Sequence, residues 1–148
     1  MIGRLLLVWI LSIGFLQLAH AKEQASPIGT WITVSDKTHD RSGMVNIYER
    51  NGKLYGKVIK IFPGSGRNPA AICDQCPAPF KNKPVMNMVI LWDFIPQQEG
   101  VWGNGHIMDT KTGDIYQSTL TLIEGGKQLQ VRGYWGIFWR TQVWTRAH

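Results

Sequence analysis

The chain has 148 residues, of which 44% are hydrophobic and 18% charged, and its formal net charge is +6. That length suits one domain that buries its own core without many disulfides, and only two cysteines are present. The positive charge would suggest nucleic acid as a partner, but no basic run with interleaved aromatic residues marks a strand-binding groove. We therefore expect no nucleic-acid partner, whereas an anionic membrane surface or an acidic ligand remains compatible with the charge.

Residues 1–21 have the pattern of a cleaved signal peptide. Arg4 precedes an apolar run at residues 5–18, which is followed by Ala19-His20-Ala21. The two alanines fit the small-residue preference of signal peptidase. An uncleaved membrane anchor is disfavoured, because about 14 apolar residues fall short of the roughly 20 that cross a bilayer. The sequence predicts cleavage after Ala21 and a single domain over residues 22–148, in the periplasm or secreted.

The remaining chain has the pattern of an all-β protein. Short runs of β-branched and aromatic residues alternate with Gly, Asn and Asp clusters, and no amphipathic helical period persists. Asn51-Gly52 is typical of a two-residue type I′ hairpin turn. The eight predicted strands are residues 29–35, 44–50, 53–62, 85–94, 100–109, 114–123, 127–135 and 137–146.

The short connections between these strands predict antiparallel neighbours, because a parallel crossover needs a dozen residues or more. The predicted fold is an eight-stranded antiparallel up-and-down β-barrel. The interior of a barrel of that size is either filled by side chains or holds one small ligand.

The one long connection, residues 63–84, contains Cys73 and Cys76 in a C-x-x-C spacing. A redox pair of this spacing usually sits at a helix N-terminus, and the proline-rich flanks predict no helix. Zinc would need two more ligands, and no histidine stands at ligand spacing. An exported protein with two cysteines favours a structural disulfide, worth about 2 kcal/mol, over a redox pair or half a metal site. We predict no metal and no cofactor.

Candidate acid and base residues do not form a catalytic motif. Asp93 and Asp109 stand at predicted strand ends, where turn-forming carboxylates are common. His106 lies alone within a strand. Nothing in the sequence orders these groups around a reacting atom, so no catalytic residue is predicted.

Aromatic residues are the most suggestive feature of the predicted strands. Alternation places Trp144, Gln142 and Arg140 on one face of the last strand, and Tyr116 on a face of the sixth. Such a mixture is typical of a ligand cavity, with apolar walls and a few polar groups. The alternative is that these large side chains fill a small barrel. In GYWGIFW, residues 133–139, a hairpin turn would expose aromatic side chains to a partner or a membrane surface.

Several motifs, in this order, resemble the exported bacterial family catalogued as domain of unknown function 2147 (DUF2147). The resemblance covers nearly the whole chain after residue 21 and implies a fold and a compartment more than an activity. The motifs are SPIGTW, NGKLYGKVIKI, CDQC, MVILWDF and VRGYWGIFWRTQVWTR.

The chain also resembles, more weakly, the calycin and lipocalin barrels. These begin with G-x-W on the first strand and carry an arginine near the end of the last strand, packed over the tryptophan. Gly29-x-Trp31 matches the first element, and Arg140 or Arg146 could supply the second. Such a cation–π contact contributes about 0.5–2 kcal/mol.

Three functional hypotheses follow, in order of preference. The first is non-catalytic binding of a small apolar or amphipathic ligand at a site that includes Trp31, Tyr116, Arg140 and Trp144. The second is an envelope interaction module with a filled barrel, and the third is a thiol-redox or hydrolytic enzyme. An interior cavity of several hundred Å³ would favour the first over the second.

Overall fold

The computed structural model describes residues 25–64 and 66–148. The predicted signal peptide, residues 1–21, lies outside the described residues. Within them, no helix is long and apolar enough to cross a bilayer.

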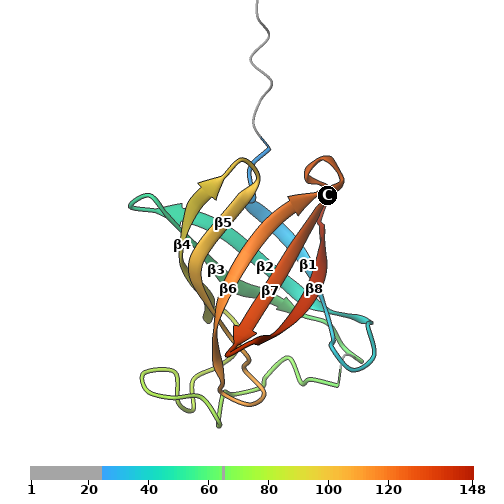
Figure 1. The fold of residues 1–148 in the computed structure, drawn as a ribbon. Helices are drawn as coiled ribbons and strands as arrows, with labels where there is room; N and C mark the ends of the chain where they lie inside the picture. The colour runs from blue at the N-terminus through green and yellow to red at the C-terminus, as the bar shows by residue number, and fades with distance from the viewer. Residues whose placement is uncertain (1–24, 65) are drawn as a thin grey trace, which may run out of the picture.

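The chain forms a closed barrel in which each of eight strands pairs antiparallel with the next, and the last pairs with the first (Figure 1). This confirms the predicted fold class. One 3₁₀ turn, η1 (Glu124–Gly126), joins two of the strands. The strands are β1 (Gly29–Val34), β2 (Arg41–Arg50), β3 (Lys53–Ile61), β4 (Val89–Gln98), β5 (Val101–Met108), β6 (Ile115–Ile123), β7 (Gln128–Trp135) and β8 (Phe138–Arg146).

The bounds of β4 differ most from the prediction, which placed this strand at residues 85–94. It begins later because Asn87 has a φ of 65° and forms a turn before Val89. It ends later because β5 pairs with it as far as Gln98. β3 pairs with it only as far as Phe94, so residues 95–98 have one unpaired edge. Pro96, which lacks an N–H, is tolerated at such an unpaired edge.

One end of the barrel is closed by Trp31 and Arg146. Trp31 is 0% exposed, and its indole N–H donates to the Pro27 carbonyl at 2.8 Å. The Arg146 guanidinium lies 4.2 Å from the centre of the Trp31 ring and donates to the carbonyls of Ser26, Ile28 and Gly126. Of the two arginines that the sequence offered, the structure therefore places Arg146 over the tryptophan.

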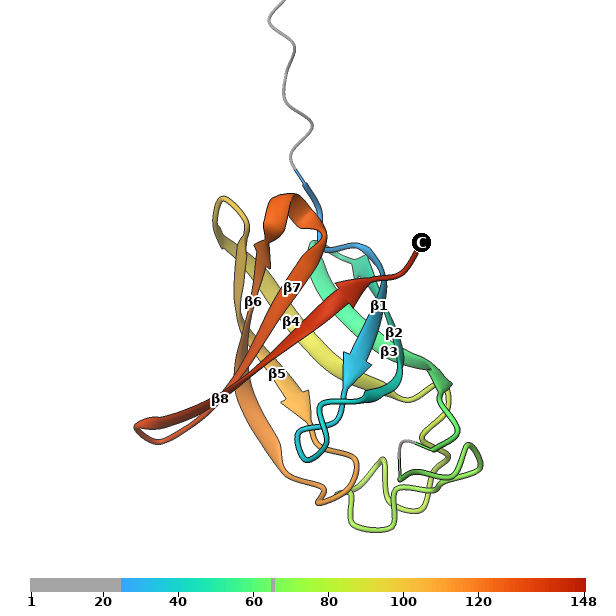
Figure 2. The same cartoon turned by 90° about the vertical axis from the view of Figure 1, so that its right-hand side faces the viewer.

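The long connection between β3 and β4 lies at the opposite end of the barrel (Figure 2). Cys73 and Cys76 are buried there and joined by a disulfide, which supports the predicted structural bond. The Cys73 N–H donates to Lys83 O at 2.8 Å, and its Sγ lies 3.3 Å from Thr110 O. The disulfide segment therefore packs against the turn between β5 and β6.

Candidate functional site

The barrel end opposite Trp31 contains a cavity of about 880 Å³. Strand alternation aims apolar side chains into its deep part, because every second residue of each strand faces the interior. We call these buried residues the apolar floor. They are Val45, Val58, Ile61, Met108 and Val131 from the strands, together with Val85 from the connection between β3 and β4.

Gly133 on β7 also faces this cavity and leaves room in its wall. A Cβ added there would lie 3.5 Å from Tyr116 Cβ and 3.6 Å from Ile107 Cγ2, both ordinary contact distances. A side chain larger than alanine would extend from that point into the cavity. Glycine therefore keeps space open beside the apolar floor.

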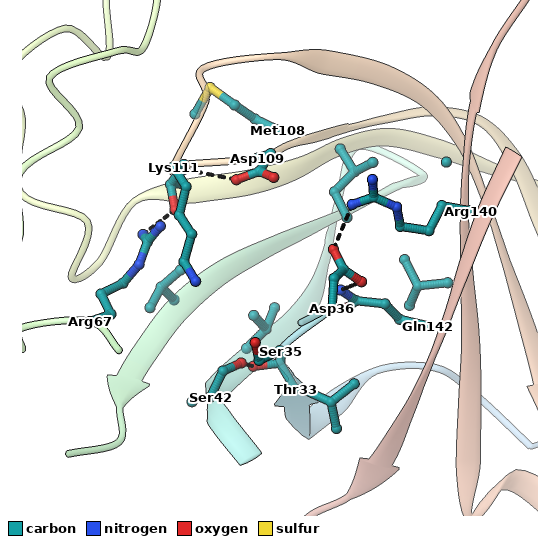
Figure 3. A pocket seen from close by; sticks show the side chains of 18 of the residues that line it. Thr33, Ser35, Asp36, Ser42, Arg67, Met108, Asp109, Lys111, Arg140 and Gln142 are labelled. Atoms are coloured by element: carbon teal, nitrogen blue, oxygen red, sulfur yellow. Dashed lines mark hydrogen bonds and ion pairs between the residues drawn. The ribbon is translucent and has the colours of Figure 1, made fainter. Parts of the chain in front are cut away.

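Charged and polar side chains surround the cavity at its outer end, which we call the mouth. Figure 3 shows Arg67, Asp109 and Lys111 on one side and Asp36, Arg140 and Gln142 on the other. These groups come from the long connection, from the β1–β2 and β5–β6 turns, and from the start of β8. The site is therefore apolar at depth and charged at its entrance.

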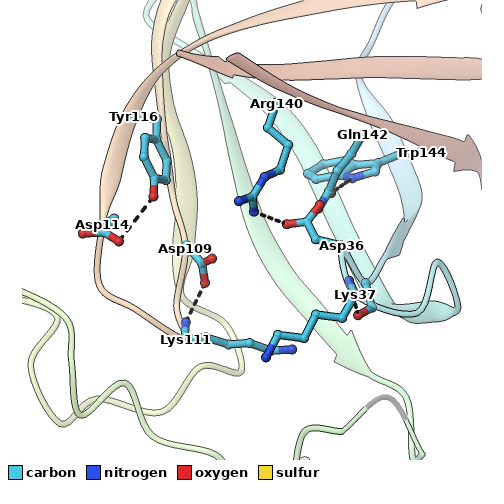
Figure 4. A network of polar contacts seen from close by, with 10 residues as sticks. Asp36, Lys37, Asp109, Lys111, Asp114, Tyr116, Arg140, Gln142 and Trp144 are labelled. Carbon is cyan, nitrogen blue, oxygen red and sulfur yellow. Dashed lines mark hydrogen bonds and ion pairs between the residues drawn. The ribbon is translucent and has the colours of Figure 1, made fainter. Parts of the chain in front are cut away.

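A chain of hydrogen bonds connects the mouth to a buried tryptophan (Figure 4). Arg140 Nη1 lies 2.9 Å from Asp36 Oδ2, and Gln142 Nε2 donates to Asp36 Oδ1 at 2.6 Å. Trp144 Nε1 then donates to Gln142 Oε1 at 2.7 Å. The chain satisfies the indole N–H of a buried side chain and holds the Arg140 guanidinium in place.

Two further mouth residues have shifted pKa values. Burial lowers the pKa of the Arg67 guanidinium, while Asp109 acts to raise it, and Arg67 donates to Thr110 Oγ1. Burial and the neighbouring Asp114 carboxylate raise the pKa of Tyr116, whose hydroxyl donates to Asp114 Oδ2 at 3.3 Å. Tyr116 therefore stays neutral and supplies a hydroxyl beside the cavity.

Positive charge exceeds negative charge around the cavity. Its lining includes five basic residues and three acidic ones, and Asp36–Arg140 is the one ion pair that the described part of the chain forms there. Figure 4 shows Lys37 and Lys111 extending toward each other from opposite sides of the mouth. The basic residues are Lys37, Lys60, Arg67, Lys111 and Arg140, and the acidic residues are Asp36, Asp109 and Asp114.

Residues 29–146 match the family described as "Uncharacterized protein conserved in bacteria (DUF2147)". The chain belongs to this family. A solved structure, protein HP1028 from the human pathogen Helicobacter pylori, described as belonging to the lipocalin family, superposes with a TM-score of 0.72. The two chains share 23% identity over 84% of each, a similarity that establishes a common fold. No curated protein matches the sequence.

The four ligand-binding residues predicted for this DUF2147 protein lie in three different places. Tyr116 and Arg140 line the cavity. Trp144 is buried and reaches the lining through Gln142, whereas Trp31 lies at the closed end beneath Arg146. Their role in binding stays a prediction.

Sequence reasoning missed other lining residues of the DUF2147 barrel. Gly133 could have been found, because alternation places it on the same face of β7 as Val131. Asp36 and Arg67 lie in connections, where no period indicates which way a side chain points.

The candidate acid–base residues of the DUF2147 chain do not converge. Asp93 accepts hydrogen bonds from Tyr55 and Lys53, and the His106 ring stacks on Trp92 with their centres 5.7 Å apart. Neither lines the cavity, whereas Asp109 does. Among the described residues, no three His, Cys, Asp or Glu side chains gather as a metal site would require.

Proposed function

We propose that this DUF2147 protein binds a small amphipathic molecule without catalysis. The apolar part of the ligand lies on the apolar floor, and its anionic group lies among the basic residues of the mouth. The observation that carries this proposal is the cavity itself. Its volume of about 880 Å³ falls within the roughly 300–1,000 Å³ of typical small-molecule sites.

Two physical terms support an amphipathic anion, and the second distinguishes it from a purely apolar ligand. Removing apolar ligand surface from water contributes about 25 cal/mol per Å². An anionic group is attracted by the positive charge of the mouth. Asp36 there neutralises Arg140, whereas Lys37 and Lys111, which extend toward each other, form no ion pair with an acidic residue of the described chain. A cavity of this size also argues against a barrel filled by its own side chains. The lipocalin-like fold is compatible with such a site.

Dodecanoate, titrated calorimetrically into the protein, should bind with one site per chain. Gly133→Leu should weaken this binding at least about tenfold, because a leucine side chain in the cavity displaces apolar contacts worth about 1.5–3 kcal/mol. Dodecanol, which lacks the carboxylate, should bind several-fold more weakly than dodecanoate to the unmodified protein.

The matched control is Gln130→Leu, which adds the same side chain to β7 three strand positions away, on the opposite face and outside the cavity lining. It should bind dodecanoate as the unmodified protein does. Unchanged affinity in a folded Gly133→Leu variant, or no binding of either probe to the unmodified protein, would refute the proposed site.

We further propose that residues 1–21 direct export and are removed. The protein isolated from the periplasmic fraction of an expressing bacterium should begin at Lys22, as measured by intact-mass spectrometry. Ala21→Tyr should leave a longer product, because a bulky residue at the cleavage position blocks signal peptidase. Recovery of the full 148-residue chain in the cytoplasm would exclude export.

A further inference from the structure

The turn between β7 and β8 carries four large apolar side chains that point into solvent. We call Trp135, Ile137, Phe138 and Trp139 the aromatic tip. They are 44%, 83%, 60% and 59% exposed, respectively. Figure 2 shows this hairpin projecting away from the barrel wall, at the same end as the long connection.

The pairing of β8 explains why the aromatic tip has no core to enter. β8 pairs with β7 along its whole length, but it pairs with β1 only at Thr145 and Arg146. The first half of β8 therefore has β7 as its one strand neighbour. β7 pairs with β6 only as far as Tyr134, so the hairpin beyond that residue is a two-stranded ribbon. Ile137, Phe138 and Trp139 are exposed together there, although successive residues alternate between its faces.

The aromatic tip is held in a defined arrangement. The Trp135 ring lies 5.8 Å from the Tyr116 ring and 6.2 Å from the Phe138 ring, measured between centres. Arg140 lies 6.0 Å from the centre of the Trp135 ring, and Arg132 lies 5.8 Å from that of Trp139. Each exposed indole is therefore backed by a guanidinium on the side toward the barrel.

The hairpin carries positive charge and no negative charge. From Gln128 to Arg146 the sequence contains three arginines and no aspartate or glutamate. The acidic groups that approach from neighbouring elements are Asp36, paired with Arg140, and Asp114, bonded to Tyr116. Arg132 donates to Thr141 Oγ1 and forms no ion pair with an acidic residue of the described chain.

We propose that the aromatic tip docks on a bilayer surface that contains anionic lipids. Trp, Phe and Ile side chains enter the headgroup region, where amphipathic rings are favoured, and arginines behind them meet lipid phosphates. A folded protein partner is less suited to this surface, because a stable interface buries about 800 Å² on each side and the tip is a narrow ribbon.

Docking would place the mouth of the cavity beside the bilayer. Trp135 belongs to the aromatic tip and also lines the cavity, as does Arg140 directly behind it. A ligand that leaves the membrane at this point enters the cavity without crossing bulk water. The docking proposal itself rests on the tip and does not require the cavity to hold a ligand.

Co-sedimentation with phosphatidylglycerol–phosphatidylcholine vesicles tests this proposal with the intact barrel. The unmodified protein should bind these vesicles, bind pure phosphatidylcholine vesicles more weakly, and dissociate as salt is raised. The double variant Ile137→Ser, Phe138→Ser should lose at least about tenfold in partitioning, because two exposed apolar side chains no longer enter the interface.

The matched control is Ile28→Ser, which removes an exposed apolar side chain at the closed end and should leave vesicle binding unchanged. Brominated lipids should quench tryptophan fluorescence of the unmodified protein, and the quenching should largely disappear in a Trp135→Phe, Trp139→Phe variant. Dodecanoate binding in the absence of vesicles should survive the Ile137→Ser, Phe138→Ser substitutions, because neither residue lines the cavity, and this separates the docking proposal from the ligand site.

Three results would overturn the proposal. One is an absence of vesicle binding by the unmodified protein at low salt. A second is equal binding by the unmodified protein and the tip variant. The third is a lipid-free dimer that the tip variant converts to a monomer, which would make the aromatic tip an interface between two copies of the chain.

Discussion

Replacing Trp31 with alanine should lower the free energy of unfolding by about 3–5 kcal/mol. Trp31 is the largest side chain at the closed end and has no exposure to solvent. Its removal leaves a cavity, deprives the Pro27 carbonyl of its donor, and takes away the ring on which Arg146 stacks. Each change removes a contact that connects β1, β8 and the segment before β1.

Urea unfolding followed by circular dichroism measures this loss. Trp139→Ala is the matched control, since it removes the same side chain from an exposed position and should change the free energy of unfolding by less than about 0.5 kcal/mol. Similar losses in the two variants would show that Trp31 is not central to the closed end.

Gly113→Ala should lower the free energy of unfolding by about 2–5 kcal/mol. Gly113 has a φ of 79°, a conformation that costs other residues about 1–2 kcal/mol. An added Cβ would also lie 1.9 Å from the Gln75 carbonyl oxygen and 2.6 Å from its carbon. Since those are backbone atoms, the disulfide segment must move away from the β5–β6 turn.

Gly52→Ala is the matched control, because it carries the backbone cost of a positive φ without the clash. Gly52 has a φ of 76°, and an added Cβ there meets nothing within 4 Å. It should cost about 1–2 kcal/mol. Hydrogen exchange at Cys73 and Val85, whose N–H groups bond within the long connection, should accelerate only in Gly113→Ala. Equal losses of unfolding free energy in the two variants would mean that the disulfide segment moves away from the β5–β6 turn at no cost in stability.

Local patterns in the sequence predicted most of the fold. Runs of β-branched and aromatic residues between turn-forming clusters located all eight strands, and Asn51-Gly52 located the turn between β2 and β3. Seven of the eight ladders join strands that are consecutive in the chain, so finding the strands nearly determines their order. The start of β4 was missed because Val58 bonds to Met88 and Asn87 across the sheet, and such a contact leaves no local pattern.

The candidate site was less predictable than the fold. Alternation indicates which side chains share a face, as for Arg140 and Gln142, but not how far along the barrel each one lies. Trp31 faces the interior yet pairs with Arg146 at the closed end, far from the mouth. The polar half of the cavity depends on connections such as the one carrying Asp36, whose direction is set by contacts with β8.

The short seam between β1 and β8 has a consequence for the order in which the chain folds. Its two paired positions, Trp31 with Arg146 and Ile32 with Thr145, join residues about 115 apart in the sequence. Contacts so distant carry the largest loop-closure cost and form late. Because synthesis begins at the N-terminus, one edge of β1 stays unpaired until the last residues of the chain have been made. A chain shortened before Thr145 would remain an open sheet with two edges, prone to pair with another copy.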